Sequence, residues 1–179
     1  MSHLHLASSA GAERQPARVA PPQASQYLIF SLAREQFGVN TQRVREIIGY
    51  RAIASVPMTP PYMLGVINLR GAVVPVVDVN ARFGRAPTEV SRRTCIVILD
   101  VLVGDETHVL GIVVDSVTAV RQIDGSQIEP APTFGVGIRA DFIEGMAKVN
   151  GNFVILLDLG KVLSVDELAV AGLDAPAAD

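Results

Sequence analysis

The residues of this chain best suited to chemistry are four aspartates that each follow an apolar run: Asp78, Asp100, Asp115 and Asp158. A duplicated strand that ends in aspartate could bring two carboxylates onto one water molecule, as in paired-carboxylate hydrolases. Duplicated β enzymes of the aspartic protease type carry Asp-Thr/Ser-Gly, whereas this chain has Asp78-Val79-Asn80 and Asp158-Leu159-Gly160. We therefore expect each aspartate to accept hydrogen bonds from backbone N–H groups at a strand end.

The other reactive residue types form no catalytic or metal-binding pattern. The sequence has no Gly-x-Ser-x-Gly elbow and no phosphate-binding Gly-rich loop. His3 and His5 supply too few ligands for a closed metal site, and His108 stands alone in a polar stretch. Cys95, the single cysteine, lies in the apolar run CIVILDVLV and is expected to be a small buried hydrophobe. The sequence therefore predicts a binding module that is not an enzyme and has no cofactor or metal.

Composition predicts a globular, cytoplasmic protein. The 179 residues are 49% hydrophobic, enough for a real core, and 15 Lys and Arg face 18 Asp and Glu without a basic cluster. Nucleic acid is therefore not an expected partner. The longest apolar runs are too short for a membrane helix, so no direct membrane insertion is expected. Residues 1–24, rich in Ala, Ser and Pro, are predicted to be a disordered tail without a signal peptide, and residues 171–179 a flexible C-terminus.

An internal repeat organises the rest of the chain. Residues 65–83 return without gaps as residues 145–163, an interval of 80, and a looser match at an interval of 73 pairs Phe37-Gly38-Val39 with Leu110-Gly111-Ile112. We interpret this as a tandem duplication within one domain, 25–170, with repeats at about 26–88 and 93–165; exchange of strands between the two units is left open. The alternative is the shared composition of strands in any β protein.

Short Val- and Ile-rich bursts separated by Gly, Pro, Asn and Asp predict many strands. Chain reversals are expected at Arg70-Gly71 and Asn150-Gly151, and Pro75 predicts an edge strand or a bulge. Helical turns are expected at residues 41–45, at 125–128 with Ser126 as cap, and at 159–170. The predicted fold is mainly β, with two small barrels related by duplication and a few short helices, because barrel closure removes exposed edge strands.

Several motifs in order resemble those of the CheW family of bacterial chemotaxis coupling proteins. They are Val44-Arg45-Glu46-Ile47, Pro57, Gly65-Val66-Ile67-Asn68-Leu69-Arg70-Gly71, the following Val73-Val74-Pro75-Val76-Val77-Asp78, Gly111-Ile112-Val113-Val114-Asp115 and Pro130-Ala131-Pro132. The likeness extends from Gln26 to about Val170. It implies two five-stranded SH3-like β-barrels and a non-catalytic adaptor, recruited to membrane-associated arrays, that couples chemoreceptor cytoplasmic tips to the regulatory domain of the histidine kinase CheA.

The resemblance also implies a receptor-binding groove between the barrels. The matching positions are Val44, Glu46, Ile47, Gly65, Arg70, Val117 and Val120. The valines and Ile47 would give a helix an apolar floor, Gly65 would let it approach closely, and Glu46 and Arg70 would fix the groove wall. The alternatives are barrel core for the apolar residues, turn geometry for Gly65 and a surface ion pair for Glu46 and Arg70. Kinase-binding residues remain unknown.

Two rival functions remain. The first is a CheW-like adaptor of another receptor-kinase system, such as one that controls pili or development. The second is the duplicated hydrolase that would use Asp78 and Asp158.

Overall fold

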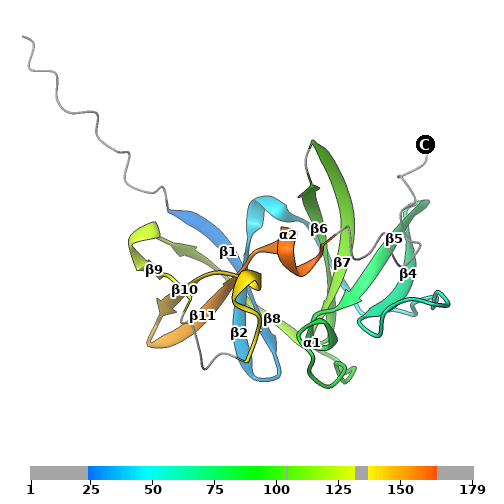
Figure 1. Ribbon diagram of the computed structural model, residues 1–179, viewed down its shortest axis with the longest axis horizontal. Coiled ribbons are helices and arrows are strands. Elements are labelled where there is room, and N and C mark those ends of the chain that lie inside the picture. The colour runs from blue at the N-terminus through cyan, green and yellow to red at the C-terminus, as the bar shows by residue number, and fades with distance from the viewer. Residues whose placement is uncertain (1–23, 104, 132–136, 165–179) are drawn as a thin grey trace, which may run out of the picture.

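Two β-sheets account for most of the computed structural model, which describes residues 24–103, 105–131 and 137–164. The first half of the chain forms β1 (Ser25–Leu32), β2 (Glu35–Asn40), η1 (Thr41–Arg43), β3 (Val44–Gly49), β4 (Met63–Leu69), β5 (Ala72–Asp78) and α1 (Val79–Arg82). The second half forms β6 (Cys95–Val103), β7 (Glu106–Val114), β8 (Ser116–Ile123), η2 (Gly125–Gln127), β9 (Ile128–Glu129), η3 (Ala140–Phe142), β10 (Ile143–Val149), β11 (Asn152–Leu157) and α2 (Leu159–Val162). Figure 1 shows the two sheets side by side, with α2 between them in this view. The predicted tails, 1–24 and 171–179, lie outside the described residues except for residue 24.

Each sheet combines strands from both halves of the chain. Sheet A has the order β8-β1-β2-β11-β10-β9, and sheet B has the order β3-β6-β7-β5-β4. The pairs β2–β11 and β5–β7 are parallel, and all other neighbours are antiparallel. The predicted mainly β fold is confirmed, and the two sheets are consistent with two SH3-like barrels, although neither hydrogen-bonded order closes into a ring. Sheet A also has a sixth, two-residue strand, β9.

The duplication is visible in the irregularities as well as in the strands. β4, β5 and α1 return as β10, β11 and α2, at the longer of the two repeat intervals. The β3–β6 pairing skips Arg45 and the β1–β8 pairing skips Thr118, and these positions match at the shorter interval. β4 and β10 skip Leu64 and Glu144, which match at the longer interval. Shared bulges at matching positions are retained features of a common unit.

The two predicted reversals between strands are confirmed. Arg70 and Gly71 have φ angles of 52° and 87°, and Asn150 and Gly151 have φ angles of 52° and 82°. Two consecutive residues with positive φ define the type I′ turn, whose twist suits a two-residue hairpin. The prediction for Pro75 is wrong: β5 is an interior strand, and the bulge lies on β4. Proline is tolerated because pairing of β5 with β7 begins only at Val76.

The helices are shorter than the sequence predicted, and two of them, α1 and η3, were missed. η1 ends at Arg43, and η2 is capped by Asp124 and not by Ser126, since Asp124 accepts the N–H of Ser126. α2 ends at Val162, while residues 165–170 of the predicted segment lie outside the described residues. α1 follows β5, as the repeat with α2 would have indicated.

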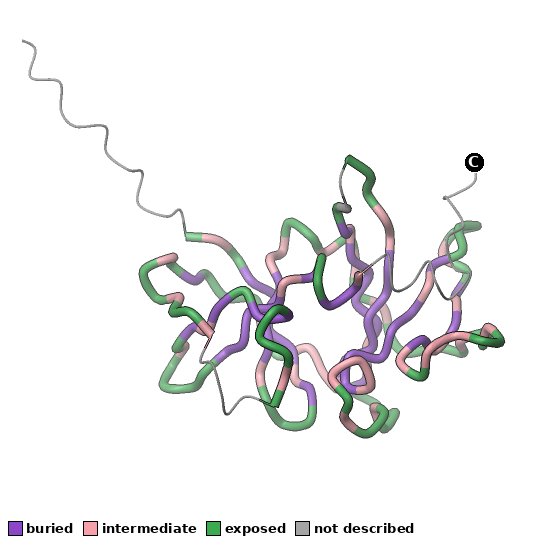
Figure 2. Tube along the Cα trace, in the orientation of Figure 1, coloured by how far each residue is buried: buried purple, intermediate pink, exposed green. Residues whose placement is uncertain are grey.

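Three hydrophobic clusters hold the fold together. The largest takes residues from both sheets, among them Phe30 and Phe37 of sheet A and Leu99 and Ile112 of sheet B. We call it the shared core. Each sheet also has its own smaller cluster. Figure 2 shows the buried segments in the middles of the strands, with exposed residues at the turns. Since a fully buried aliphatic or aromatic side chain contributes about 1.5–3 kcal/mol, the shared core is a strong connection between the sheets.

Candidate functional site

The ion pair between Glu46 and Arg70 joins the two edges of sheet B. Arg70 Nη1 lies 2.6 Å from Glu46 Oε2. Glu46 is on β3 and Arg70 follows β4, which are the first and last strands of the sheet order. Arg51 adds a second link from the β3 side, because its Nη2 donates to the carbonyl of Asn68 at 2.8 Å. The pair therefore spans the gap across which the sheet B ladder does not close.

This pair is largely a surface feature. The side chain of Arg70 is 79% exposed and that of Glu46 is 21% exposed. Exposed ion pairs contribute about 0–1 kcal/mol to stability, so this one constrains geometry more than it stabilises the fold. The matching positions of the second repeat hold the uncharged residues Ala119 and Asn150, so the pair belongs to sheet B and was not duplicated.

The predicted apolar residues divide into two groups. Val44 on β3 and Val117 on β8 are half-buried and pack against the shared core. Ile47 and Val120, on the same two strands, are 42% and 54% exposed. β3 and β8 are edge strands of sheets B and A, so these residues offer apolar surface from both sheets. The contacts of Val44 and Val117 also agree with the alternative prediction, in which these valines are part of the barrel core.

Gly65 lies against the chain itself. Its φ is +143°, and a Cβ built there would lie 2.0 Å from the carbonyl oxygen of Ala54. Ala54 and Val66 exchange two backbone hydrogen bonds of 2.9 Å, which hold the two segments together. Glycine is thus required by close approach of the chain's own backbone, and Gly145 shows the same crowding against Ile128 and Glu129. A role of Gly65 toward a receptor stays a prediction.

The four aspartates are engaged in structural contacts. Asp78 is 1% exposed and accepts both the N–H and the hydroxyl of Thr88, at 2.8 and 2.9 Å. Asp115 accepts the N–H of Ala33 at 2.6 Å, and Asp158 caps α2. Asp100 differs from the prediction, because its bond is to the side chain of Arg45 at 2.8 Å. Asp78 and Asp158 thus each bind groups of their own repeat, the structural role that the sequence analysis expected of them.

A polar cavity of about 350 Å³ lies between the sheets beside α2. Its lining includes Asn40, Arg43, Asp100, Glu144 and Asp158. Glu144 as a whole residue is exposed, yet loss of hydration raises the pKa of its carboxyl, and the carboxylate of Asp158 raises it further. Burial, followed by the charge of Glu144, raises the pKa of Tyr27. Glu144 was not among the predicted site residues. It could have been found from the repeat, because a carboxyl group stands there at the position where the first repeat has the apolar Leu64.

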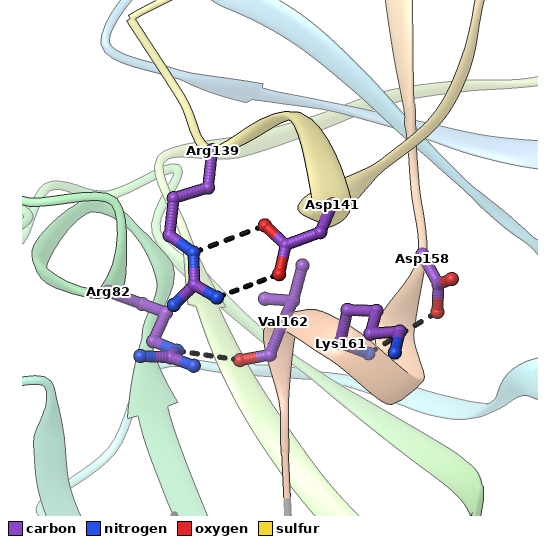
Figure 3. A network of polar contacts seen from close by, with 6 residues as sticks. All are labelled: Arg82, Arg139, Asp141, Asp158, Lys161 and Val162. Atoms are coloured by element: carbon purple, nitrogen blue, oxygen red, sulfur yellow. Dashed lines mark hydrogen bonds and ion pairs between the residues drawn. The ribbon is translucent and has the colours of Figure 1, made fainter.

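A second polar group fastens the sheets together at the other end of α2. Arg82 Nε donates to the carbonyl of Val162 at 2.8 Å, and Arg139 binds Asp141 through two bonds of 3.1 and 2.7 Å (Figure 3). The guanidinium carbon of Arg82 lies 4.7 Å from the ring centroid of Tyr62 and 4.9 Å from that of Phe142. The contacts of Arg82 with Val162 and Phe142 link the sheet B side to the sheet A side, whereas the Arg139–Asp141 pair is local to η3.

Among the described residues, no group of three or more His, Cys, Asp or Glu side chains could hold a metal ion, and no helix is long and apolar enough to cross a membrane. The polar side chains serve caps, bulges and ion pairs, and apolar surface is exposed on edge strands. Fold and site together define a duplicated two-sheet β protein that exposes apolar side chains on an edge strand of each sheet.

Comparison with known proteins places the chain within this class. The model of the CheW-like domain matches residues 26–167. The chain is 34% identical over 145 residues to the chemotaxis protein CheW of Klebsiella aerogenes, covering 81% of this chain and 85% of that one. It is 28% identical over 154 residues to protein FrzA of Myxococcus xanthus, covering 84% and 92%. The crystal structure of the scaffolding protein TtCheW from Thermoanaerobacter tengcongensis superposes with a TM-score of 0.71 at 33% identity, covering 82% and 92%.

The chain belongs to the CheW family. The resemblance seen in the sequence is confirmed, and so is the prediction of a chemotaxis adaptor.

Proposed function

We propose that this protein couples the cytoplasmic tips of chemoreceptors to the regulatory domain of the histidine kinase CheA and has no catalytic activity of its own. It acts in the cytoplasm, recruited to receptor arrays at the membrane. The observation that carries the proposal is the apolar surface of Ile47 and Val120, offered by edge strands of both sheets, with the Glu46–Arg70 pair at its margin.

The physical basis is helix-in-groove recognition. A receptor tip that presents an apolar helical face would bury Ile47 and Val120, with Val44 and Val117 beneath them against the shared core. Arg70, held by Glu46, would supply the polar rim that fixes register. Binding of this kind needs the two sheets to be held in one arrangement, because each contributes part of the surface.

An adaptor for another receptor-kinase system is the second candidate. The match to FrzA supports it, since that relative is not named as a chemotaxis protein, but its identity to this chain is lower than that of the Klebsiella aerogenes CheW. The two candidate functions share one binding mechanism and differ in which receptors and which kinase the adaptor binds.

The test is autophosphorylation of CheA on receptor-containing membranes, without adaptor and with the wild-type protein, Arg70→Glu or Arg85→Glu. Arg85 is the control because it also forms an ion pair, 2.8 Å to Glu35, and this pair joins β2 to the segment after α1 and involves no residue of β3, β4 or β8. We expect activation by the wild type and by Arg85→Glu, and loss of activation with a folded Arg70→Glu protein, in which two carboxylates would face each other. Equal activation by both variants would contradict the role of Arg70, and no activation by the wild type would favour another receptor-kinase system.

A further inference from the structure

Arg82 stands where elements of the two sheets meet. It ends α1, which follows β5 of sheet B, and its Nε bond reaches Val162 in α2, which follows β11 of sheet A. Its guanidinium lies between the rings of Tyr62, just before β4 of sheet B, and Phe142, just before β10 of sheet A. One side chain thus contacts three residues in segments that flank strands of both sheets.

The contacts of Arg82 involve equivalent positions of the two repeats, but only the first repeat has an arginine there. Tyr62 and Phe142 occupy equivalent positions of the two repeats, so a single cation is held between two matching rings. The equivalent of Arg82 is Val162 itself, whose side chain is buried in the shared core. A planar guanidinium stacked on aromatic faces, with one N–H directed at a carbonyl, has little freedom to move.

We propose that Arg82 is a positioning residue that sets the relative orientation of the two sheets and thereby the shape of the receptor-binding surface. That surface takes Ile47 from sheet B and Val120 from sheet A, so a partner that contacts both is sensitive to the angle between the sheets. The effect on receptor binding rests on the proposed function, whereas the effect on sheet orientation does not.

The experiment measures orientation and binding separately. Spin labels are placed on Val73→Cys in sheet B and Phe153→Cys in sheet A, which are 70% and 60% exposed, in a Cys95→Ser background. Pulsed electron paramagnetic resonance then gives the distance between the sheets for the wild type, Arg82→Met and Arg82→Lys. Affinities for a receptor-tip fragment and for the kinase regulatory domain are measured on the same variants without labels.

Arg139→Met is the matched control. Arg139 also stacks on Phe142, at 4.6 Å, but its ion pair to Asp141 stays within the η3 segment. We expect Arg82→Met to shift or broaden the distance distribution and to weaken receptor-fragment binding about tenfold, the scale of one charged hydrogen bond, with affinity for the regulatory domain unchanged. Arg82→Lys should give a smaller change in the same direction, and Arg139→Met none.

An unchanged distance distribution in Arg82→Met would overturn the inference. If that variant does not fold, Arg82→Lys decides, because it keeps the charge and loses the Nε donor and the planar group; wild-type distances and affinity in Arg82→Lys would then overturn the inference. If the wild-type protein does not bind the receptor fragment but Arg82→Met still changes the distance between the labelled sheets, the proposed function is refuted. The role of Arg82 in positioning the sheets is then still supported.

Discussion

Asp78 and Asp158, at equivalent positions of the two repeats, cap their helices with the same bond: Asp78 Oδ1 accepts the N–H of Ala81 at 3.4 Å, and Asp158 Oδ1 accepts that of Lys161 at 3.3 Å. They differ in their second contact. Thr88 covers Asp78 and donates two more bonds to it, whereas Asp158 lies on the wall of the polar cavity. The same capping aspartate is therefore buried and holds Thr88 in the first repeat, as Asp78, and is accessible from the cavity in the second repeat, as Asp158.

Replacing the two caps should consequently have unequal effects. Asp78→Ala removes the cap and leaves the N–H and hydroxyl of Thr88 without their acceptor, which should lower the free energy of unfolding by about 3 kcal/mol. Asp158→Ala loses a cap alone, at about 1 kcal/mol. Urea unfolding of both variants measures the difference. Equal losses would show that the Thr88 contacts contribute nothing.

Exchanging the charges of the edge-joining pair tests what the pair does. Arg70→Glu should abolish receptor coupling with a stability change below about 1 kcal/mol, since the Arg70 side chain is 79% exposed, and Glu46→Arg should also abolish coupling. The double variant restores opposite charges across the same gap. If the pair acts by fixing the groove wall, the double variant regains receptor affinity. If it stays inactive while folded, Arg70 contacts the receptor directly and its sign matters.

Alanine at Gly65 should be severely destabilising. The new Cβ would overlap the carbonyl of Ala54, and the φ of +143° is unfavourable for alanine, so we expect a loss of about 3 kcal/mol or more. Gly145→Ala should cost less, because its nearest neighbour is a movable methyl of Ile128 at 2.5 Å. Gly49→Ala is the control, with no atom within 4 Å. Thermal unfolding of the three variants measures their relative stabilities, which should fall in the order Gly49→Ala, Gly145→Ala, Gly65→Ala. A near-neutral Gly65→Ala would contradict the backbone contact.

The carboxyl of Glu144 should make stability depend on pH. Its pKa is raised in the folded protein from the usual value of 4.5, so the folded state binds the proton more tightly than the unfolded state does. Stability therefore falls as the pH rises from the unfolded pKa through the folded one. Glu144→Gln should be more stable than the wild type at pH 7, and the difference should vanish below the unfolded pKa. Glu106→Gln, on an exposed carboxyl, provides the control.

A difference between wild type and Glu144→Gln that is the same at pH 4 and pH 7 would show that the carboxyl is not desolvated in the fold. The carboxylate of Asp158 is the second cause of the raised pKa of Glu144, after loss of hydration, so Asp158→Asn should reduce the pH dependence of stability that Glu144 produces.

Sequence reasoning recovered what depends on local pattern and on repetition. The turn at Arg70-Gly71 follows from turn chemistry, and the equivalence of Gly65 with Gly145 follows from the repeat. The contact of Glu46 with Arg70 was available only through family resemblance, since no local rule pairs residues on strands 24 positions apart.

Long-range pairing explains what was missed. Glycine is needed at position 65 because the carbonyl of Ala54 lies against it. The segment that contains Ala54 folds back onto β4, and the hydrophobic pattern of the sequence does not predict this contact. The position of Arg82 between Tyr62 and Phe142 requires residues from both repeats, so it appears only when the sheets are assembled. Pro75 was misplaced because the ladder between β5 and β7 begins at Val76, one residue after Pro75, although β5 itself begins at Ala72.

The mixing of strands also governs how the chain can be made. Among the described strands, β1 and β2 are synthesised before the others and pair with each other, but their outer neighbours are β8 and β11, and β11 spans Asn152–Leu157. Sheet B is fully synthesised once β7 has emerged, whereas sheet A is complete only after β11 has emerged. During translation the β1–β2 hairpin therefore keeps Phe30 and Phe37 exposed until the later strands that complete their cluster have been made, and exposed apolar surface of this kind favours aggregation.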